Sequence, residues 1–252
     1  MYKPVIIGLV IGLLISVTIS CPAASGDQGE ALINAARDGD LKQVQSLLEQ
    51  GIDVDTKNSD GITALMAASA YGRIEVVRAL LEEGADLDAI DNNGITALML
   101  TCVNGQLETL RLLLEDGADP DAKDNNGVTA LTVASALGHP EAVRLLLEEG
   151  ADFNAKDKDG DTALMAACVK GHIEAVRLLL EKGADPNSKD NDGDTALIIA
   201  SATGHIEAVK LLLVKGADVN ARGKDGKTPL TAASTAGHAD IVELLKARSA
   251  KE

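Results

Sequence analysis

Glycines recur along this chain with a spacing of 33 residues, in three separate registers. Three registers that share one spacing mark an internal repeat, and residues 28–252 hold about seven units of that length. Such a repeat predicts a solenoid, in which each unit buries its apolar face only against its neighbours. The three sets are Gly61, Gly94, Gly127, Gly160, Gly193 and Gly226; Gly39, Gly72, Gly105, Gly138, Gly171, Gly204 and Gly237; and Gly51, Gly84, Gly117, Gly150, Gly183 and Gly216.

One unit from the middle of the chain predicts two short helices joined by turns. Its first residues, 157–160, form a turn sequence, because the closing glycine can take a positive φ without strain. Thr162 is a suitable N-cap for a first helix over 163–169. A second helix over 173–182 carries an apolar stripe at helical spacing, and Gly183 ends it. Each unit is therefore a helix–turn–helix followed by an extended, hairpin-like loop.

These features resemble the ankyrin repeat. The matching segments are the Gly-x-Thr-Ala-Leu helix starts, the Gly-His between the helices, the triple Leu and the Gly-Ala-Asp-x-Asn-Ala loop. The resemblance implies an all-α repeat solenoid of stacked helix-turn-helix ankyrin repeats joined by β-hairpin-like loops. Polar substitutions in the first and last units are typical of terminal caps. The expected division is an N-terminal cap (28–58), five repeats (59–91, 92–124, 125–157, 158–190, 191–223) and a C-terminal cap (224–252).

The chain departs from the family pattern at the start of the first helix. The family's Thr-Pro-Leu-His start keeps its threonine in six units, but its proline survives only at Pro229. Alanine is tolerated there, because the first helical N–H has no helical partner. The family histidine, whose side chain ties adjacent loops, is replaced by Met66, Met99, Thr132, Met165, Ile198 and Thr231.

Composition restricts the class of function. Aromatic residues make up 1% of the chain, so the core must be built from Leu, Ala, Val and Ile. The net charge is −16, which repels phosphate backbones and argues against nucleic-acid binding. Three cysteines cannot make a disulfide framework.

Residues 1–25 differ from the rest and predict a signal peptide. Lys3 precedes an apolar run over 5–19, and small residues follow. The run is shorter than the ~20 residues that span a bilayer comfortably. Cys21 ends a segment that resembles a bacterial lipobox, although Thr18 stands where Leu is usual. Three alternatives stay open: lipidation at Cys21, ordinary cleavage beyond it, or retention of the uncleaved leader as an anchor. Each predicts an exported protein, periplasmic, envelope-anchored or secreted.

No residue set predicts catalysis or a cofactor. The four histidines, His139, His172, His205 and His238, share one repeat position and predict a structural role between the helices. Cys102 and Cys168 share another position that demands a small buried residue, so we expect free thiols. The turns over 157–161 and 190–194 resemble calcium loops but lack the Glu that such a loop needs. We therefore expect no catalytic residue, no cofactor site and no metal site.

Positions that vary between repeats are the candidates for recognition. The residue after the turn glycine and the pair at the end of the first helix both vary, and the resemblance implies that they face the concave groove. Exposed apolar residues gathered there would form a binding patch. The alternative is that some of them pack under neighbouring loops. The protein-binding candidates are Ile62, Tyr71, Ile95, Val103, Asn104, Val128, Leu137, Asp161, Lys170 and Asp194.

The sequence thus predicts a monomeric, acidic, exported ankyrin-repeat protein that binds another protein through its groove, without catalysis. The charge favours a basic partner, and no nucleic acid. Contact with a membrane would come only through the leader or a lipidated Cys21. The alternative is an envelope-tethered structural scaffold with no dedicated groove ligand.

Overall fold

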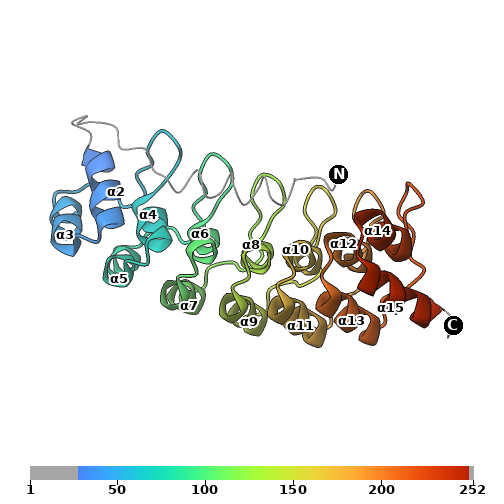
Figure 1. The fold of residues 1–252 in the computed structure, drawn as a ribbon. Coiled ribbons are helices and arrows are strands. Elements are labelled where there is room, and N and C mark those ends of the chain that lie inside the picture. Colours follow the sequence, from blue (N-terminus) through green and yellow to red (C-terminus); the bar gives the residue numbers. More distant parts are fainter. Residues whose placement is uncertain (1–27, 250–252) are drawn as a thin grey trace. The chain divides into compact units, whose positions relative to one another are not determined.

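The computed structural model describes residues 28–249, and Figure 1 labels its helices α2–α15. These fourteen helices follow one another without a strand in the described range, so the predicted all-α fold is confirmed. An isolated antiparallel bridge joins Lys189 and Thr195. The expected leader over 1–25, with Cys21, lies outside the described residues. Across 28–249, every helix is too short or too polar to cross a membrane.

The chain divides into two compact units, Met1–Ala130 and Leu131–Glu252. In both, helices alternate between an inner helix, the first of each pair, and an outer helix, the second. The described part of the first unit holds inner helices α2 (Gln28–Asp38), α4 (Ala64–Ala70) and α6 (Ala97–Asn104), and outer helices α3 (Leu41–Glu49), α5 (Ile74–Glu82) and α7 (Leu107–Glu115).

The second unit begins inside α8 and continues the same alternation. Its inner helices are α8 (Ala130–Leu137), α10 (Ala163–Lys170), α12 (Ala196–Thr203) and α14 (Pro229–Ala236). Its outer helices are α9 (Pro140–Glu148), α11 (Ile173–Lys182), α13 (Ile206–Val214) and α15 (Ala239–Ser249).

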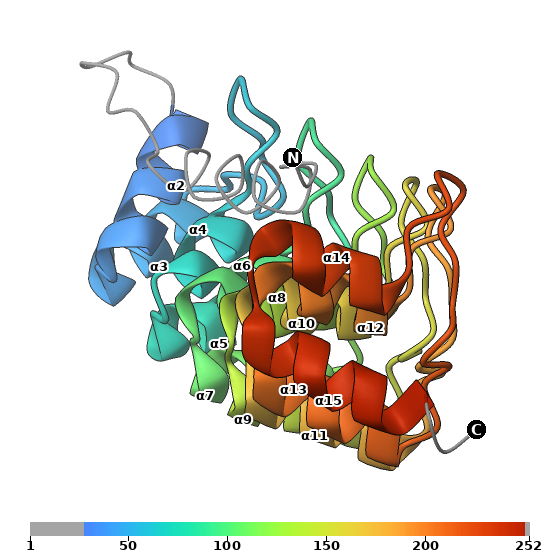
Figure 2. The same ribbon diagram turned by 45° about the vertical axis from the view of Figure 1, so that its right-hand side comes forward.

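Within each unit the inner and outer helices form two layers. In the first unit α4 packs between α2 and α6, and α5 packs between α3 and α7. In the second unit α12 packs between α10 and α14, and α11 and α13 lie in sequence between α9 and α15 (Figure 2). The inner helices are short and rich in Ala, Leu and Met, which lets the layers approach closely. The core lies between the layers, and its largest fully buried side chains include Leu65, Leu98 and Leu164.

Threonines cap the inner helices α4, α6, α10, α12 and α14, as the sequence predicts. The hydroxyl of Thr162 accepts a hydrogen bond from the backbone N–H of Met165 at 3.3 Å, and Thr195 accepts one from Ile198 at 3.4 Å. Such a cap satisfies one of the N–H groups that a helix start leaves unpaired. At α14, Thr228 and Thr231 form a reciprocal capping box.

Hydrogen bonds between successive repeats explain why histidine recurs at one repeat position. The Nε2 atoms of His172, His205 and His238 each lie 3.2 Å from a carbonyl oxygen at the end of the preceding inner helix. Each imidazole lies against a glycine of the preceding repeat, because a side chain would not fit there. A Cβ on Gly171, where φ is +70°, would collide with the imidazole of His205. The predicted structural role is therefore observed as a link between successive repeats. In the first unit Arg73 makes the same link, from its Nε to the carbonyl of Arg37 at 2.9 Å.

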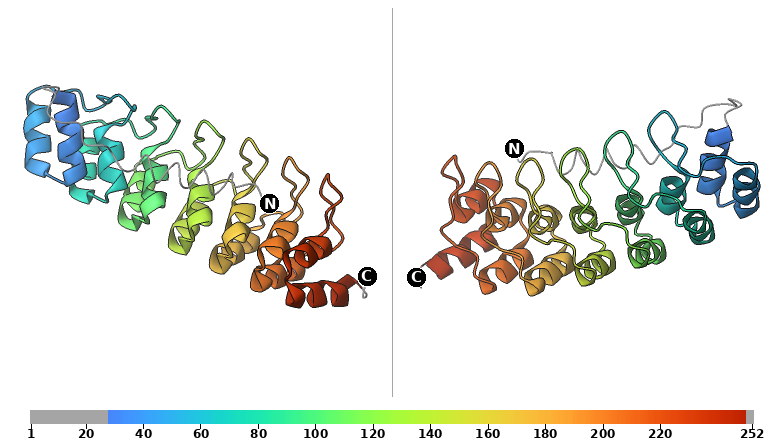
Figure 3. Two further views of the ribbon diagram at one scale, coloured as in Figure 1. Left: turned by 45° about the horizontal axis from the view of Figure 1, so that its top comes forward. Right: turned by 180° about the vertical axis from the view of Figure 1, so that it is seen from behind.

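The loops between the helix pairs project from one edge of each unit (Figure 3). Each loop closes on itself by a backbone bond, as between the Asp157 N–H and the Asp161 carbonyl at 3.1 Å. Within each unit, successive loops are joined by a further backbone bond, as between the Asn191 N–H and the Asp159 carbonyl at 2.8 Å. Asn191 adds a bond from its side chain to the carbonyl of Lys158. The loops are thus hairpin-like and stacked, without forming a sheet.

Candidate functional site

Six of the ten predicted groove residues are buried. The prediction of an exposed apolar patch is therefore wrong for four apolar residues, and the prediction of exposed acidic side chains is wrong for two aspartates. Asp161 is 9% exposed and Asp194 is 6% exposed. The buried six are Ile62, Ile95, Val103, Val128, Asp161 and Asp194.

Close stacking of the loops is the physical reason for this burial at the four residues that follow a turn glycine and have a bonded loop beside them, which are Ile62, Ile95, Asp161 and Asp194. The residue after the turn glycine has its own N–H held by an Asx side chain four residues earlier, as in the 2.9 Å bond from Ile62 to the Oδ1 of Asn58. The next loop then binds directly against this turn, with the Asn92 N–H bonded to the Asp60 carbonyl at 3.0 Å. A side chain at this position is covered by the neighbouring repeat.

The ends of the inner helices hold the predicted residues that do reach solvent. Tyr71 and Leu137 are partly exposed, and Asn104 and Lys170 are exposed. Asn104 also donates from its Nδ2 to the carbonyl of Ala70 at 2.8 Å, so its side chain is oriented by the preceding repeat. These four residues remain the candidates for contact with a partner.

An Asx position in the turns from Asn58 to Asp190 is a feature that the sequence analysis missed. The Oδ1 of Asp157 accepts from the N–H groups of Asp159 and Asp161 at 2.9 and 2.8 Å. Asp190 does the same for Asp192 and Asp194. The signal was present as an Asp or Asn three residues before five of the six turn glycines, an arrangement typical of Asx turns; Gly223 holds that position before Gly226. These aspartates shape the turns.

We call residues 157–161 and 190–194 the acidic turns. Asp161 lies in the first of them, and burial raises the pKa of its carboxyl to about 7. The charges of Asp157 and Asp190 act in the same direction, followed by those of Asp159 and Asp192. Burial and like charges both disfavour the ionised form, so Asp161 titrates near neutral pH.

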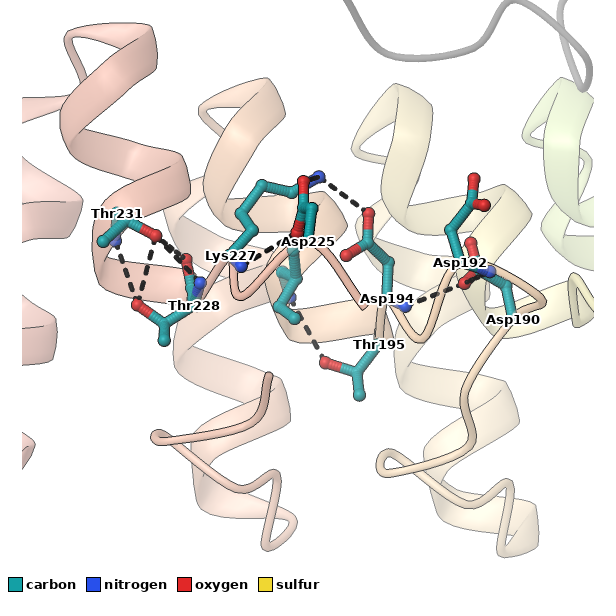
Figure 4. Close-up of polar contacts among 9 residues, drawn as sticks. Asp190, Asp192, Asp194, Thr195, Asp225, Lys227, Thr228 and Thr231 are labelled. Carbon is teal, nitrogen blue, oxygen red and sulfur yellow. Dashed lines mark hydrogen bonds and ion pairs between the residues drawn. The ribbon is translucent and has the colours of Figure 1, made fainter. Parts of the chain in front are cut away.

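Asp194, in the second acidic turn, has a cationic neighbour. The Nζ of Lys227 lies 3.0 Å from its Oδ2 and 3.6 Å from the Oδ2 of Asp225 (Figure 4). Burial raises the pKa of Asp194, while the hydrogen bond and charge of Lys227 oppose that rise. Burial tends to lower the pKa of Lys227, but the bond to Asp194 and the nearby carboxylates raise it. On balance the pKa of Asp194 is raised, because burial outweighs the lysine, and the pKa of Lys227 is raised as well.

The cysteine and histidine side chains have structural positions. Cys102 and Cys168 are buried free thiols, and burial raises the pKa of each to about 12. Burial also lowers the pKa of His172, whose ring is engaged by a backbone carbonyl. Over residues 28–249, no three His, Cys, Asp or Glu side chains lie close enough to share a metal ion.

Comparison with known families agrees with this architecture. A family model described as "Ankyrin repeats (3 copies)" matches residues 32–124, 117–190 and 183–251. The matches cover most of the chain, which therefore belongs to the ankyrin-repeat family. A search of curated proteins finds no match. Ankyrin repeats generally mediate protein–protein interaction, and the family is typically non-catalytic.

Proposed function

We propose that this protein binds another protein through the surface made by the ends of its inner helices and the adjoining loops. One observation carries the proposal: four side chains at the inner-helix ends differ from repeat to repeat and reach solvent, while the buried scaffold repeats. Tyr71, Asn104, Leu137 and Lys170 are the residues concerned. A surface that varies on a constant scaffold is suited to recognition.

Binding without turnover is the second part of the proposal. The two thiols are buried with raised pKa values, so they are poor nucleophiles. Three histidines are engaged by backbone carbonyls, which leaves them badly placed to serve as general bases. These observations support a role in recognition.

A photo-crosslinking amino acid at position 170 tests the proposed surface in the native host. Lys170 is exposed at the end of α10, and Arg177 is exposed on the outer helix α11 of the same repeat, so position 177 is a matched control. We expect one discrete protein adduct at 170 and none at 177. Equal adducts at both positions, or adducts at 177 alone, would contradict the proposal.

Export is a further proposal, supported by the charge and apolar pattern of residues 1–25. Intact-mass measurement on protein from the native host tests it. Loss of residues 1–20 is expected. A mass that includes them would contradict cleavage, and a diacylglyceryl adduct on Cys21 would favour the envelope-tethered alternative.

A further inference from the structure

An asparagine precedes a glycine at three places in this chain. Asn93 and Asn126 lie in loop turns, and Asn104 is the last residue of the inner helix α6. Asparagine is a thermally labile residue, because the backbone nitrogen of the following residue can attack its side-chain carbonyl carbon. Glycine offers the least steric resistance to this attack, since it has no side chain. The three sites therefore share one local chemistry and differ in their structural surroundings.

In the two loop turns the asparagine side chain is exposed and weakly held. The Nδ2 of Asn93 lies 3.5 Å from the Oδ2 of Asp91, which is too long for a strong hydrogen bond. The backbone N–H of Asn126 is bonded to Asp124 at 2.8 Å, but its side-chain amide has no partner among residues 28–249. Both amides are therefore free to turn towards the following glycine.

Asn104 is held in place by its surroundings. Its Nδ2 donates to the carbonyl of Ala70 at 2.8 Å, which anchors the amide to the preceding repeat. The N–H of Gly105 is bonded to the carbonyl of Thr101, where it ends the helix. Attack at this site requires the helix end to open and the amide to leave its bond. The same pair of residues is therefore protected here.

Loop stacking requires the glycine that makes the turn asparagine reactive. Gly94 has a φ of +81°, and a Cβ there would lie 2.7 Å from the backbone nitrogen of Asn125 in the next loop. A larger residue would therefore separate the two loops. The missing side chain that permits this close approach is also what leaves Asn93 open to attack.

We propose that Asn93 and Asn126 are sites of spontaneous deamidation in the folded protein, with water as the co-reactant. The glycine nitrogen loses its proton and bonds to the side-chain carbonyl carbon, and the side-chain nitrogen leaves as ammonia. Water then adds to one of the two carbonyls of the resulting cyclic imide and breaks that carbonyl's bond to nitrogen. Overall, one amide and one water give one carboxylate and one ammonium ion. The product is aspartate or isoaspartate, according to which carbonyl is attacked.

The two products affect the turn differently. Isoaspartate adds one backbone atom and converts the Asn93 carbonyl, which accepts the Asn125 N–H at 2.8 Å, into a free carboxylate. This product should weaken the link between the two loops. Aspartate should leave the turn unchanged, because four other repeats carry it at this position, at Asp60, Asp159, Asp192 and Asp225.

Peptide mapping by mass spectrometry tests the proposal on the purified protein, incubated over time in mildly alkaline buffer. A parallel sample is unfolded in guanidinium chloride and serves as the control for sequence, because all three asparagines then precede a glycine without any structure. We expect similar rates at the three sites in the unfolded chain. In the folded protein Asn93 and Asn126 should react at least about tenfold faster than Asn104, since the Asn104 amide must first leave its hydrogen bond.

Two variants and an assay for isoaspartate test the consequences. Asn93→Asp and Asn126→Asp each remove one reactive site, so the mass gain should vanish from that peptide alone. The melting curve of each variant should overlay that of the original protein. Isoaspartate is measured in aged protein with an isoaspartate-specific methyltransferase, and the molecules that carry it should unfold at a lower denaturant concentration than the rest.

Reaction at Asn104 as fast as at Asn126 in the folded protein would overturn the proposal, because the structure would then not distinguish the sites. Intact Asn93 and Asn126 in folded protein, over a time in which the unfolded chain reacts fully, would also overturn it. A melting curve altered by either substitution would refute the equivalence of the product with the aspartates of the other repeats. None of these outcomes depends on the proposed protein-binding function.

Discussion

Asp161→Asn should stabilise the protein, and the gain should grow with pH. The side chain is buried with like charges around it, and its pKa is raised from 3.8 to about 7. Asparagine has nearly the same shape and carries no charge. The variant therefore removes the electrostatic penalty of the ionised carboxylate and retains its packing.

The magnitude follows from the linkage between protonation and folding. A pKa that is raised on folding means that the folded state binds the proton more tightly, so stability is highest below about pH 4 and is lost as pH rises towards 7. The difference between 3.8 and about 7 corresponds to about 4 kcal/mol. Solvent screening of the exposed flanking carboxylates reduces this, so we expect a gain of about 2–4 kcal/mol for Asp161→Asn at pH 8.

The assay is urea unfolding at a series of pH values, followed by circular dichroism, with the stability of the original protein subtracted from that of each variant. The difference for Asp161→Asn should shrink to under about 1 kcal/mol near pH 4, where both side chains are neutral. Asp159→Asn is the control, because that residue is exposed and should give less than about 0.5 kcal/mol at every pH. Lys227→Gln should have the opposite sign and destabilise the protein at pH 8, because it leaves Asp194 without its cation. A pH-independent difference for Asp161→Asn, or a loss of stability at pH 8, would refute the reasoning.

Four other outcomes are expected. Leu179→Ala should cost about 2–5 kcal/mol in denaturant melts, since Leu179 is fully buried in α11; a cost near zero would contradict the packing. Ile95→Asp should unfold or strongly destabilise the protein, because the structure buries Ile95, and an unchanged melting temperature would contradict that burial. His205→Ala should lower the free energy of unfolding by about 1 kcal/mol, because the side chain loses its bond to the preceding repeat. Lys210→Ala is the control, since Lys210 is exposed and its loss should leave stability nearly unchanged. Cys102 and Cys168 should react with a thiol reagent only after unfolding, and labelling of the native protein would contradict their burial.

Much of the helical scaffold could be predicted because its signals are local. The threonine caps, the glycines that end helices and the apolar stripes all act within a few residues, so the period of 33 carries them from unit to unit. The histidine position could be predicted as structural. Its partner could not, because the carbonyl that it binds lies 36 residues earlier in the chain.

The candidate site was predicted less well, because the exposure of its residues also depends on contacts with residues that are distant in the sequence. Ile62 and Asp161 occupy a position that varies between repeats, and this variation together with the resemblance to the family suggested exposure. Whether a side chain there reaches solvent depends on how tightly the next loop binds the turn. Tyr71 and Lys170 lie at helix ends that no loop covers fully, so their expected exposure is consistent with the structure.

By itself, the sequence determined the repeat length, the pairing of short helices, the family and the acidic charge, because each follows from residue spacing or composition. Only the tertiary structure decided which variable residues are covered and which aspartate has a counter-charge. Asp161 and Asp194 look equivalent in the sequence, in turns that differ little. They become different because the residue one repeat later is an aspartate for the first and a lysine for the second, and stacking brings that distant residue against the buried carboxylate.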